Sequence, residues 1–249
     1  MRVLGRKWSS LSAITPAAIC LLGLLSLRQL RAQSTETQYP RMAPIEQYLM
    51  DRNAEIELAR SAATEAITHD ATILVLGRHG YETAVEGKNG FVCMVERGLV
   101  GPSDWPDYWN PKIRGADCLN PLAARSILPI AKMRTAMALD GTSREKIIES
   151  ISEALRERKF PALEPGAMGY MMAKGSYLTD QGGHNAPHLM FFVPLSDANT
   201  WGASLPGSPV GSGPYWFFSE EASQNHKDFP PLRIFTVRVG KWSDGTPAP

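Results

Sequence analysis

Apolar positions recur at helical spacing in two parts of the first half of the chain. From Pro44 to Ile67 they fall three or four residues apart, and Pro44 suits a first helical turn. Residues 123–139 are apolar around most of a helical circumference, which predicts a buried helix despite Pro129. Each segment is expected to pack against a core.

A third helical segment, "TSREKIIESISEALRERKF", has a clearer start signal. Thr142 stands three residues before Glu145, the spacing of a capping box. Apolar residues form one stripe along the segment, and Pro161 follows it as a stop signal. The pattern therefore predicts about three helices in the chain.

Short β-favouring runs separated by turn residues occupy the rest of the chain. "ATILVLG", "YETAVEG" and "FVCMVER" follow one another from Ala71, and Asn89-Gly90 before the third run is a strong hairpin signal. These runs predict a three-stranded meander. Four more strands are expected in the C-terminal third, in "AMGYMMAKG", "HLMFFVP", "PYWFFSE" and "LRIFTVRVGKW".

The order of these elements predicts an α+β fold. Strands and helices come in blocks, without regular alternation, which favours one mainly antiparallel sheet. No long linker divides the chain, so residues 43–249 are expected to form a single domain. Residues 33–42 are polar and predicted to be a disordered lead-in.

The first 32 residues have the layout of a secretory signal peptide. Three basic residues precede an apolar run from Leu11 to Leu27, and Leu30 and Ala32 fill the recognition positions before a cut after Ala32. The alternative is an uncleaved membrane anchor, for which the run of 17 residues is short. Export to the periplasm or outside the cell is the expectation.

Signal removal changes the charge of the chain. The segment carries five of the 26 basic residues and no acid, which leaves 21 basic against 25 acidic residues, a net charge of −4. No later block of like charge stands out. Nucleic acid and, after signal removal, membrane surfaces are therefore not expected as partners, because both need a basic footprint.

Two cysteines, Cys93 and Cys118, remain after signal removal. In an oxidising compartment they most simply form one disulfide. The alternative, a thiol pair that binds metal, lacks the close C-x2-C spacing of a zinc site. Gly101 to Pro121 is a long Pro/Gly/Asp/Asn-rich excursion, and the disulfide would tie its end back to the sheet.

Several segments resemble an uncharacterised family of secreted bacterial proteins. They are "GYETAVEGKNGFVCMVER", the Asp117-Cys118 pair and "HLMFFVP", and members of the family carry similar NGF-x-C and H-x-M-F-x-x-P segments. The resemblance runs from about Glu57 to the C-terminus. It implies export, a Cys93–Cys118 pairing and a shared single-domain fold, and it implies no activity, cofactor or catalytic residue.

The stretch "DQGGHNAPHLMFFVP" is the strongest candidate for chemistry. His184 and His188, completed by Asp180 or His226, form a possible set of ligands for zinc or another divalent metal. Pro187 and the preceding glycines make a helix improbable, so such a site would be built from a loop. The competing interpretation is a surface loop followed by a buried strand that His188 opens.

An aromatic loop offers a second candidate. Trp105, Tyr108 and Trp109 are possible stacking platforms for a sugar, near the carboxylates of Asp104, Asp107 and Asp117. The competing interpretation is that these rings close the core beneath a stapled loop. No nucleophile elbow, Walker or dinucleotide motif occurs.

The sequence thus leaves two functions open. The favoured one is an exported, non-catalytic binding or envelope-associated protein without a cofactor, which uses the aromatic loop or the Gly/Pro-rich segment "NTWGASLPGSPVGSGPYW". The alternative is a metal-dependent hydrolase centred on His184 and His188.

Overall fold

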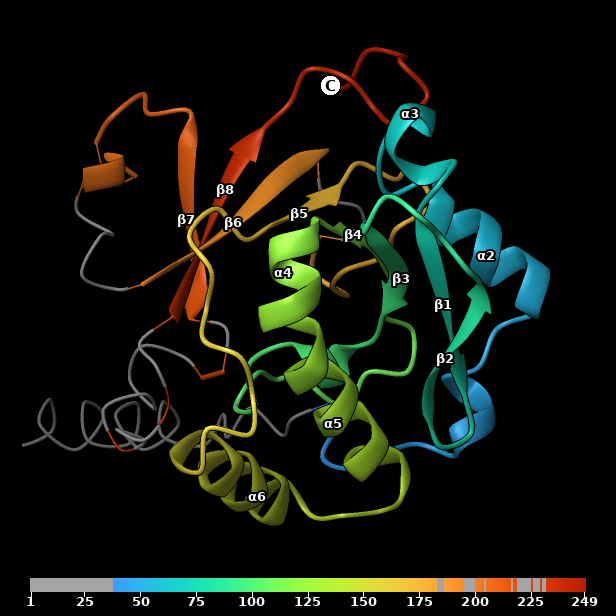
Figure 1. Cartoon of the computed structure of the whole chain (residues 1–249), viewed down its shortest axis with the longest axis vertical. Helices are drawn as coiled ribbons and strands as arrows, with labels where there is room; N and C mark the ends of the chain where they lie inside the picture. The colour runs from blue at the N-terminus through green and yellow to red at the C-terminus, as the bar shows by residue number, and fades with distance from the viewer. Residues whose placement is uncertain are drawn as a thin grey trace, which may run out of the picture. The chain divides into compact units, whose positions relative to one another are not determined.

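One eight-stranded sheet organises the chain (Figure 1). The computed structural model describes residues 38–182, 186–194, 200–203, 205–215, 217–218, 225, 229 and 232–249. The strand order is β2-β1-β3-β4-β5-β6-β8-β7. The strands are β1 (Thr72–Gly77), β2 (Gly80–Val85), β3 (Val92–Glu96), β4 (Gly115–Leu119), β5 (Met168–Met171), β6 (His188–Pro194), β7 (Val210–Tyr215) and β8 (Leu232–Arg238).

Helices cover both faces of the sheet. They are η3 (Ile45–Gln47), α2 (Arg52–Arg60), α3 (Glu65–Thr68), η4 (Gly98–Val100), α4 (Pro121–Ser126), α5 (Leu128–Leu139) and α6 (Arg144–Arg156). Figure 1 shows α4 and α5 lying over one face, with α6 beside α5. Within the described ranges, no helix has the length and apolar character that a membrane span needs.

Alternation along the central strands separates two cores. Cys93 and Val95 of β3 pack with Ala59 of α2, whereas Met94 between them packs with α4 and α5. Among the described strand pairs, all are antiparallel except β1 with β3. The predicted α+β class with one mainly antiparallel sheet is confirmed.

The predicted helix from Pro44 to Ile67 is divided into η3, α2 and α3. A new helix start causes the first break: the Asp51 side chain accepts hydrogen bonds from the backbone N–H groups of Asn53 and Ala54, both at 3.0 Å. Periodic apolar spacing alone does not reveal such an internal cap.

The predicted three-stranded meander is wrong in the pairing of its third strand, β3. β1 and β2 form a hairpin, but β3 pairs with β1 in parallel. The chain crosses the start of β1 at Gly87, where a Cβ atom would lie 2.2 Å from the backbone nitrogen of Thr72. The Asn89 side chain accepts a hydrogen bond from the Phe91 N–H and donates one to the Ile67 carbonyl. Asn89-Gly90 therefore shapes a crossover and not a hairpin turn.

The two later predicted helical segments are helical in the structure, but their boundaries differ from the prediction. Residues 123–139 form two helices, and Pro129 lies in the first turn of α5, where its missing N–H costs nothing. The N-cap of α6 is Ser143, one residue after the expected Thr142, and its hydroxyl accepts a hydrogen bond from the Lys146 N–H.

The third C-terminal strand lies earlier than predicted. β7 begins at Val210, in a Gly/Ser/Pro-rich segment that is typical of loops, whereas Phe217 and Phe218 lie after the strand and are buried in the core. β7 is an edge strand, and edges tolerate the proline and glycines of its sequence. Trp216 lies outside the described residues.

The Cys93–Cys118 disulfide is present, and it joins directly opposite residues of β3 and β4. The expected Pro/Gly-rich excursion is shorter than predicted, because its last part is the fully buried strand β4. The bridge closes a loop with a sequence separation of 25 residues, which stabilises the fold by about 3 kcal/mol in the chain-entropy account.

A buried ion pair fixes α2 to the sheet. Arg97 Nη2 lies 2.9 Å from Glu55 Oε1, and both side chains are about 1% exposed or less. Glu55 also accepts the Leu76 N–H, and Arg97 donates to the carbonyl oxygens of Tyr48 and Val95. These added hydrogen bonds offset the desolvation cost that a buried pair alone would carry.

Candidate functional site

The structure describes only part of the proposed metal site. His184 and His226 lie outside the described residues, whereas Asp180 and His188 lie within them. In the described ranges, no group of three His, Cys, Asp or Glu side chains is arranged to hold a metal ion. The site around His184 and His188 stays a prediction.

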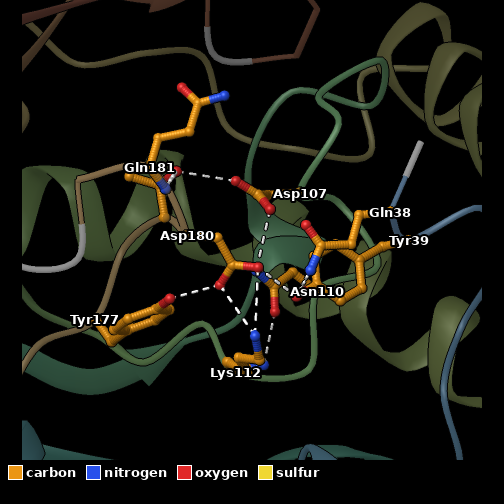
Figure 2. Close-up of polar contacts among 9 residues, drawn as sticks. Gln38, Tyr39, Asp107, Asn110, Lys112, Tyr177, Asp180 and Gln181 are labelled. Atoms are coloured by element: carbon orange, nitrogen blue, oxygen red, sulfur yellow. Dashed lines mark hydrogen bonds and ion pairs between the residues drawn. The ribbon is translucent and has the colours of Figure 1, made fainter. Parts of the chain in front are cut away.

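Asp180 is the centre of a polar cluster that joins three distant segments (Figure 2). Its carboxylate accepts hydrogen bonds from the hydroxyls of Tyr39 and Tyr177, the latter at 2.5 Å. Lys112 Nζ lies 3.4 Å from both carboxylate oxygens. The loop around Lys112 is held further by Asp107, which accepts hydrogen bonds from Asn110 and Thr179.

The bonds around Asp180 stabilise its charged form. The hydrogen bond from Tyr177, followed by that from Tyr39, lowers the pKa of Asp180 to about 2. The hydrogen bond from Tyr177 to Asp180 also raises the pKa of Tyr177. The pKa of Tyr39 is raised by burial and, to a smaller extent, by its own hydrogen bond to Asp180. Asp180 is the first residue of "DQGGHNAPHLMFFVP". Its contacts with Lys112 connect this segment to the loop that contains the aromatic residues.

His188 is the first residue of β6 and is 8% exposed. Its Nδ1 lies 2.8 Å from the Ala186 carbonyl oxygen. Because a carbonyl only accepts, Nδ1 carries the proton. Burial lowers the pKa of His188, so the neutral ring is the favoured form.

The three aromatic residues of the loop have different surroundings. Tyr108 is fully buried, Trp109 is 7% exposed, and both belong to the core cluster beside α5. The Arg144 guanidinium lies over both rings, 4.9 Å and 5.6 Å from their centroids. Only Trp105 keeps a partly exposed ring, so stacking of a ligand on the other two would require the loop to move.

A buried pair of carboxylates lies under α5. The sequence predicts a role for Asp117 only as a neighbour of the aromatic loop and does not pair it with Glu96. Glu96 of β3 and Asp117 of β4 point to the same face of the sheet as Met94. Asp117 is fully buried, and neither carboxylate oxygen has a hydrogen bond of good geometry in the described part of the chain. The backbone N–H groups of Cys118 and Tyr170 are its nearest donors and oppose the rise of its pKa only in part. A Cβ atom on the neighbouring Gly169 would lie 2.4 Å from Asp117 Oδ1, so a larger residue there would displace the Asp117 carboxyl group.

Both carboxyl groups favour the protonated form. Burial raises the pKa of Glu96 to about 7, and the charge of Arg134 opposes this shift only in part. Burial, followed by the negative charge of Glu96, raises the pKa of Asp117 well above its usual range. Part of Glu96 stays accessible to solvent although its carboxylate lies deep among protein atoms. We therefore expect the titration of Glu96 to change the free energy of unfolding only moderately.

A mainly apolar cavity of about 300 Å³ lies beside α5 and α6. We call it the α5–α6 cavity. Figure 1 shows the segment after α6, in yellow, running past α4 toward β5, and this segment supplies one wall. The lining is apolar except for Ser126 and Arg158, and it includes Ile127, Ile130, Leu155, Phe160, Leu163 and Phe217.

Phe217, which lines the cavity, also lies near a buried cation. The Arg134 guanidinium lies 6.0 Å from the Phe217 ring centroid and donates to the carbonyl oxygens of Val100 and Gly101. Ser126 donates its hydroxyl proton to the Leu122 carbonyl at 2.7 Å. Neither of these polar groups presents an unsatisfied donor to the cavity.

A scan against protein-family models finds no match, and searches of curated proteins and of solved structures find no similar chain.

We predict that the protein becomes less stable as the pH rises from about 5 to 8. The folded state keeps a proton on Glu96 up to a pH of about 7, whereas the unfolded chain releases it near 4.5. This contribution is fully present below pH 4.5 and is lost through pH 7, with a size of about 1 to 2 kcal/mol. Urea unfolding at several pH values measures it.

Glu96→Gln is the control for this prediction. His188 acts in the opposite sense below pH 6.5, because its folded-state pKa is lowered. The comparison of wild type with Glu96→Gln removes that contribution. The decline should be smaller in the variant, and the part that remains belongs to Asp117, whose raised pKa acts in the same sense as that of Glu96. An equal decline in both proteins would contradict the assignment to Glu96.

We also predict that His188→Ala lowers the free energy of unfolding by about 1 to 3 kcal/mol, because the Ala186 carbonyl loses a buried partner. His184→Ala, in a glycine-rich stretch, should change it by less than about 0.5 kcal/mol. Thermal unfolding with and without zinc completes the test. A zinc-dependent rise in Tm that both variants abolish would favour the metal site instead.

Proposed function

We propose that this chain is an exported binding protein that takes up a small, mainly apolar molecule in the α5–α6 cavity. The observation that carries the proposal is the cavity itself, with its volume of about 300 Å³ and its nearly continuous apolar lining. Small-molecule sites are concave, largely preformed and lined by apolar side chains with a few polar groups. The cavity has these properties and lies at the lower end of their usual size range, roughly 300 to 1,000 Å³.

The position of the cavity also supports binding. Its walls come from α4, α5, the end of α6 and the segment that follows α6, which leads to β5. The Asn120 side chain donates to the Gly166 carbonyl at 2.9 Å, and Arg125 forms two hydrogen bonds of 2.8 Å to Glu164. These contacts hold the segment against α4, so the cavity does not depend on one loose loop.

This proposal moves the binding site away from the two surfaces that the sequence favours. The aromatic loop has Tyr108 and Trp109 in the core. The Gly/Pro-rich segment includes residues outside the described ranges and also contains the edge strand β7.

Export is the second part of the proposal. The disulfide Cys93–Cys118 is what an oxidising compartment favours, and the first 32 residues have the pattern of a cleaved signal. The metal-dependent hydrolase is the other candidate function, and it rests on the sequence pattern of His184 and His188 alone.

We predict that the protein isolated from its native host begins near Gln33. Peptide mapping by mass spectrometry under non-reducing conditions should also find one cross-linked pair of peptides that contains Cys93 and Cys118. An intact Met1 in a membrane fraction would refute signal removal. Two free thiols in exported protein would refute the bridge.

We predict that N-phenyl-1-naphthylamine, a neutral fluorescent probe, binds in the cavity with a Kd of roughly 0.1 mM or tighter. Ala162 is exposed and lines the cavity, so Ala162→Trp should place a ring there and weaken probe binding at least about tenfold. Fluorescence titration gives both constants.

Ala54→Trp is the matched control. Ala54 is an exposed alanine on α2, which packs on the other face of the sheet. The control should bind the probe like the wild type. Probe binding that is absent in the wild type, or equal in the two variants, would refute the cavity as the binding site.

A further inference from the structure

Arg158 has a backbone conformation that its side chain does not favour. It is the only residue other than glycine with a positive φ, 56°, in the described part of the chain. It follows the Glu157 C-cap of α6, at the position where helices commonly place glycine. An L-residue with a Cβ pays a steric cost there that glycine does not pay.

Hydrogen bonds impose this conformation. The Arg158 N–H donates to the Leu155 carbonyl at 3.0 Å, and the Lys159 N–H donates to the Ala154 carbonyl at 2.9 Å. This pair of bonds defines a Schellman motif, which ends a helix with one left-handed residue. The motif explains the backbone, but it does not explain why the residue is arginine.

The Arg158 side chain lies at the cavity. It lines the cavity and is exposed, so it stands where the apolar lining meets solvent. The neighbouring carboxylates have other partners: Glu157 pairs with Lys159, and Glu164 pairs with Arg125. Within the described ranges, no hydrogen bond or ion pair engages the Arg158 guanidinium.

We propose that Arg158 binds the anionic group of an amphipathic ligand whose apolar part fills the α5–α6 cavity. The inference rests on the proposed binding function and names the class of ligand: a carboxylate or a similar anion on a single apolar chain. A residue kept in a costly conformation beside a cavity is a reason to look for a function. A guanidinium offers several donors in a planar fork that suits a carboxylate.

The test compares decanoate with decan-1-ol as competitors of the neutral probe. The two share an apolar chain and differ in charge, so their affinity ratio reports the contribution of the anion. Decanoate should bind the wild type about three- to tenfold more tightly than it binds Arg158→Gly or Arg158→Asn. Decan-1-ol should bind all three proteins equally, and added salt should weaken only decanoate.

Two further measurements separate binding from structure. Arg158→Lys keeps the charge but loses the planar fork, so decanoate should bind it less tightly than the wild type and more tightly than Arg158→Gly. Arg158→Gly relieves the left-handed arginine and should unfold at a higher urea concentration than the wild type. A variant that is more stable and binds the anion less well cannot have lost affinity through misfolding.

The outcomes distinguish the two proposals. If the probe and decan-1-ol bind but the decanoate affinity is the same in wild type and Arg158→Gly, the cavity binds apolar molecules and the role of Arg158 is refuted. If neither the probe nor either competitor binds the wild type, both the binding function and the ligand class are refuted.

Discussion

The antiparallel pairing of β3 with β4 is the constraint on which the rest of the structure depends. Its register places Cys93 opposite Cys118 on the face that α2 covers. Because side chains alternate along a strand, the same register places Glu96 and Asp117 on the face that α5 covers. A shift of β4 by one residue would separate the cysteines and turn Asp117 toward α2. The disulfide therefore fixes the strands and also the position of the buried acids.

This arrangement combines costly and stabilising features within one part of the sheet. Asp117 is buried without a hydrogen bond of good geometry among the described residues, which typically costs about 1 to 3 kcal/mol. The disulfide contributes stability of similar size on the other face. The Glu55–Arg97 pair adds a second fixed contact between α2 and the end of β3, and each partner also forms a hydrogen bond with a backbone group. The buried carboxyl groups thus lie directly beside the disulfide that joins β3 to β4.

Sequence reasoning succeeded where one local signal decides the outcome. The run "HLMFFVP" is strongly β-favouring, and β6 has the same bounds, His188–Pro194. It failed where a distant partner decides: β3 joins β1 because the chain crosses at Gly87, and β7 tolerates Pro214 because it is an edge strand. The Asp180 cluster combines Tyr39, Lys112 and Tyr177, whose spacing along the chain carries no periodic signal. Of that cluster, only Asp180 was a candidate from sequence.

The α5–α6 cavity was invisible in the sequence for the same reason. Its apolar lining is indistinguishable from core residues, since Ile127, Ile130 and Phe217 are also members of the main core cluster. What separates a cavity from a core is the absence of a side chain that fills it, and no single residue encodes that absence. Arg158 differs, because a helix end that lacks the usual glycine can be found from sequence once the end of α6 is known. The choice of a charged residue at a position that favours glycine is therefore the local feature on which the proposed ligand class rests.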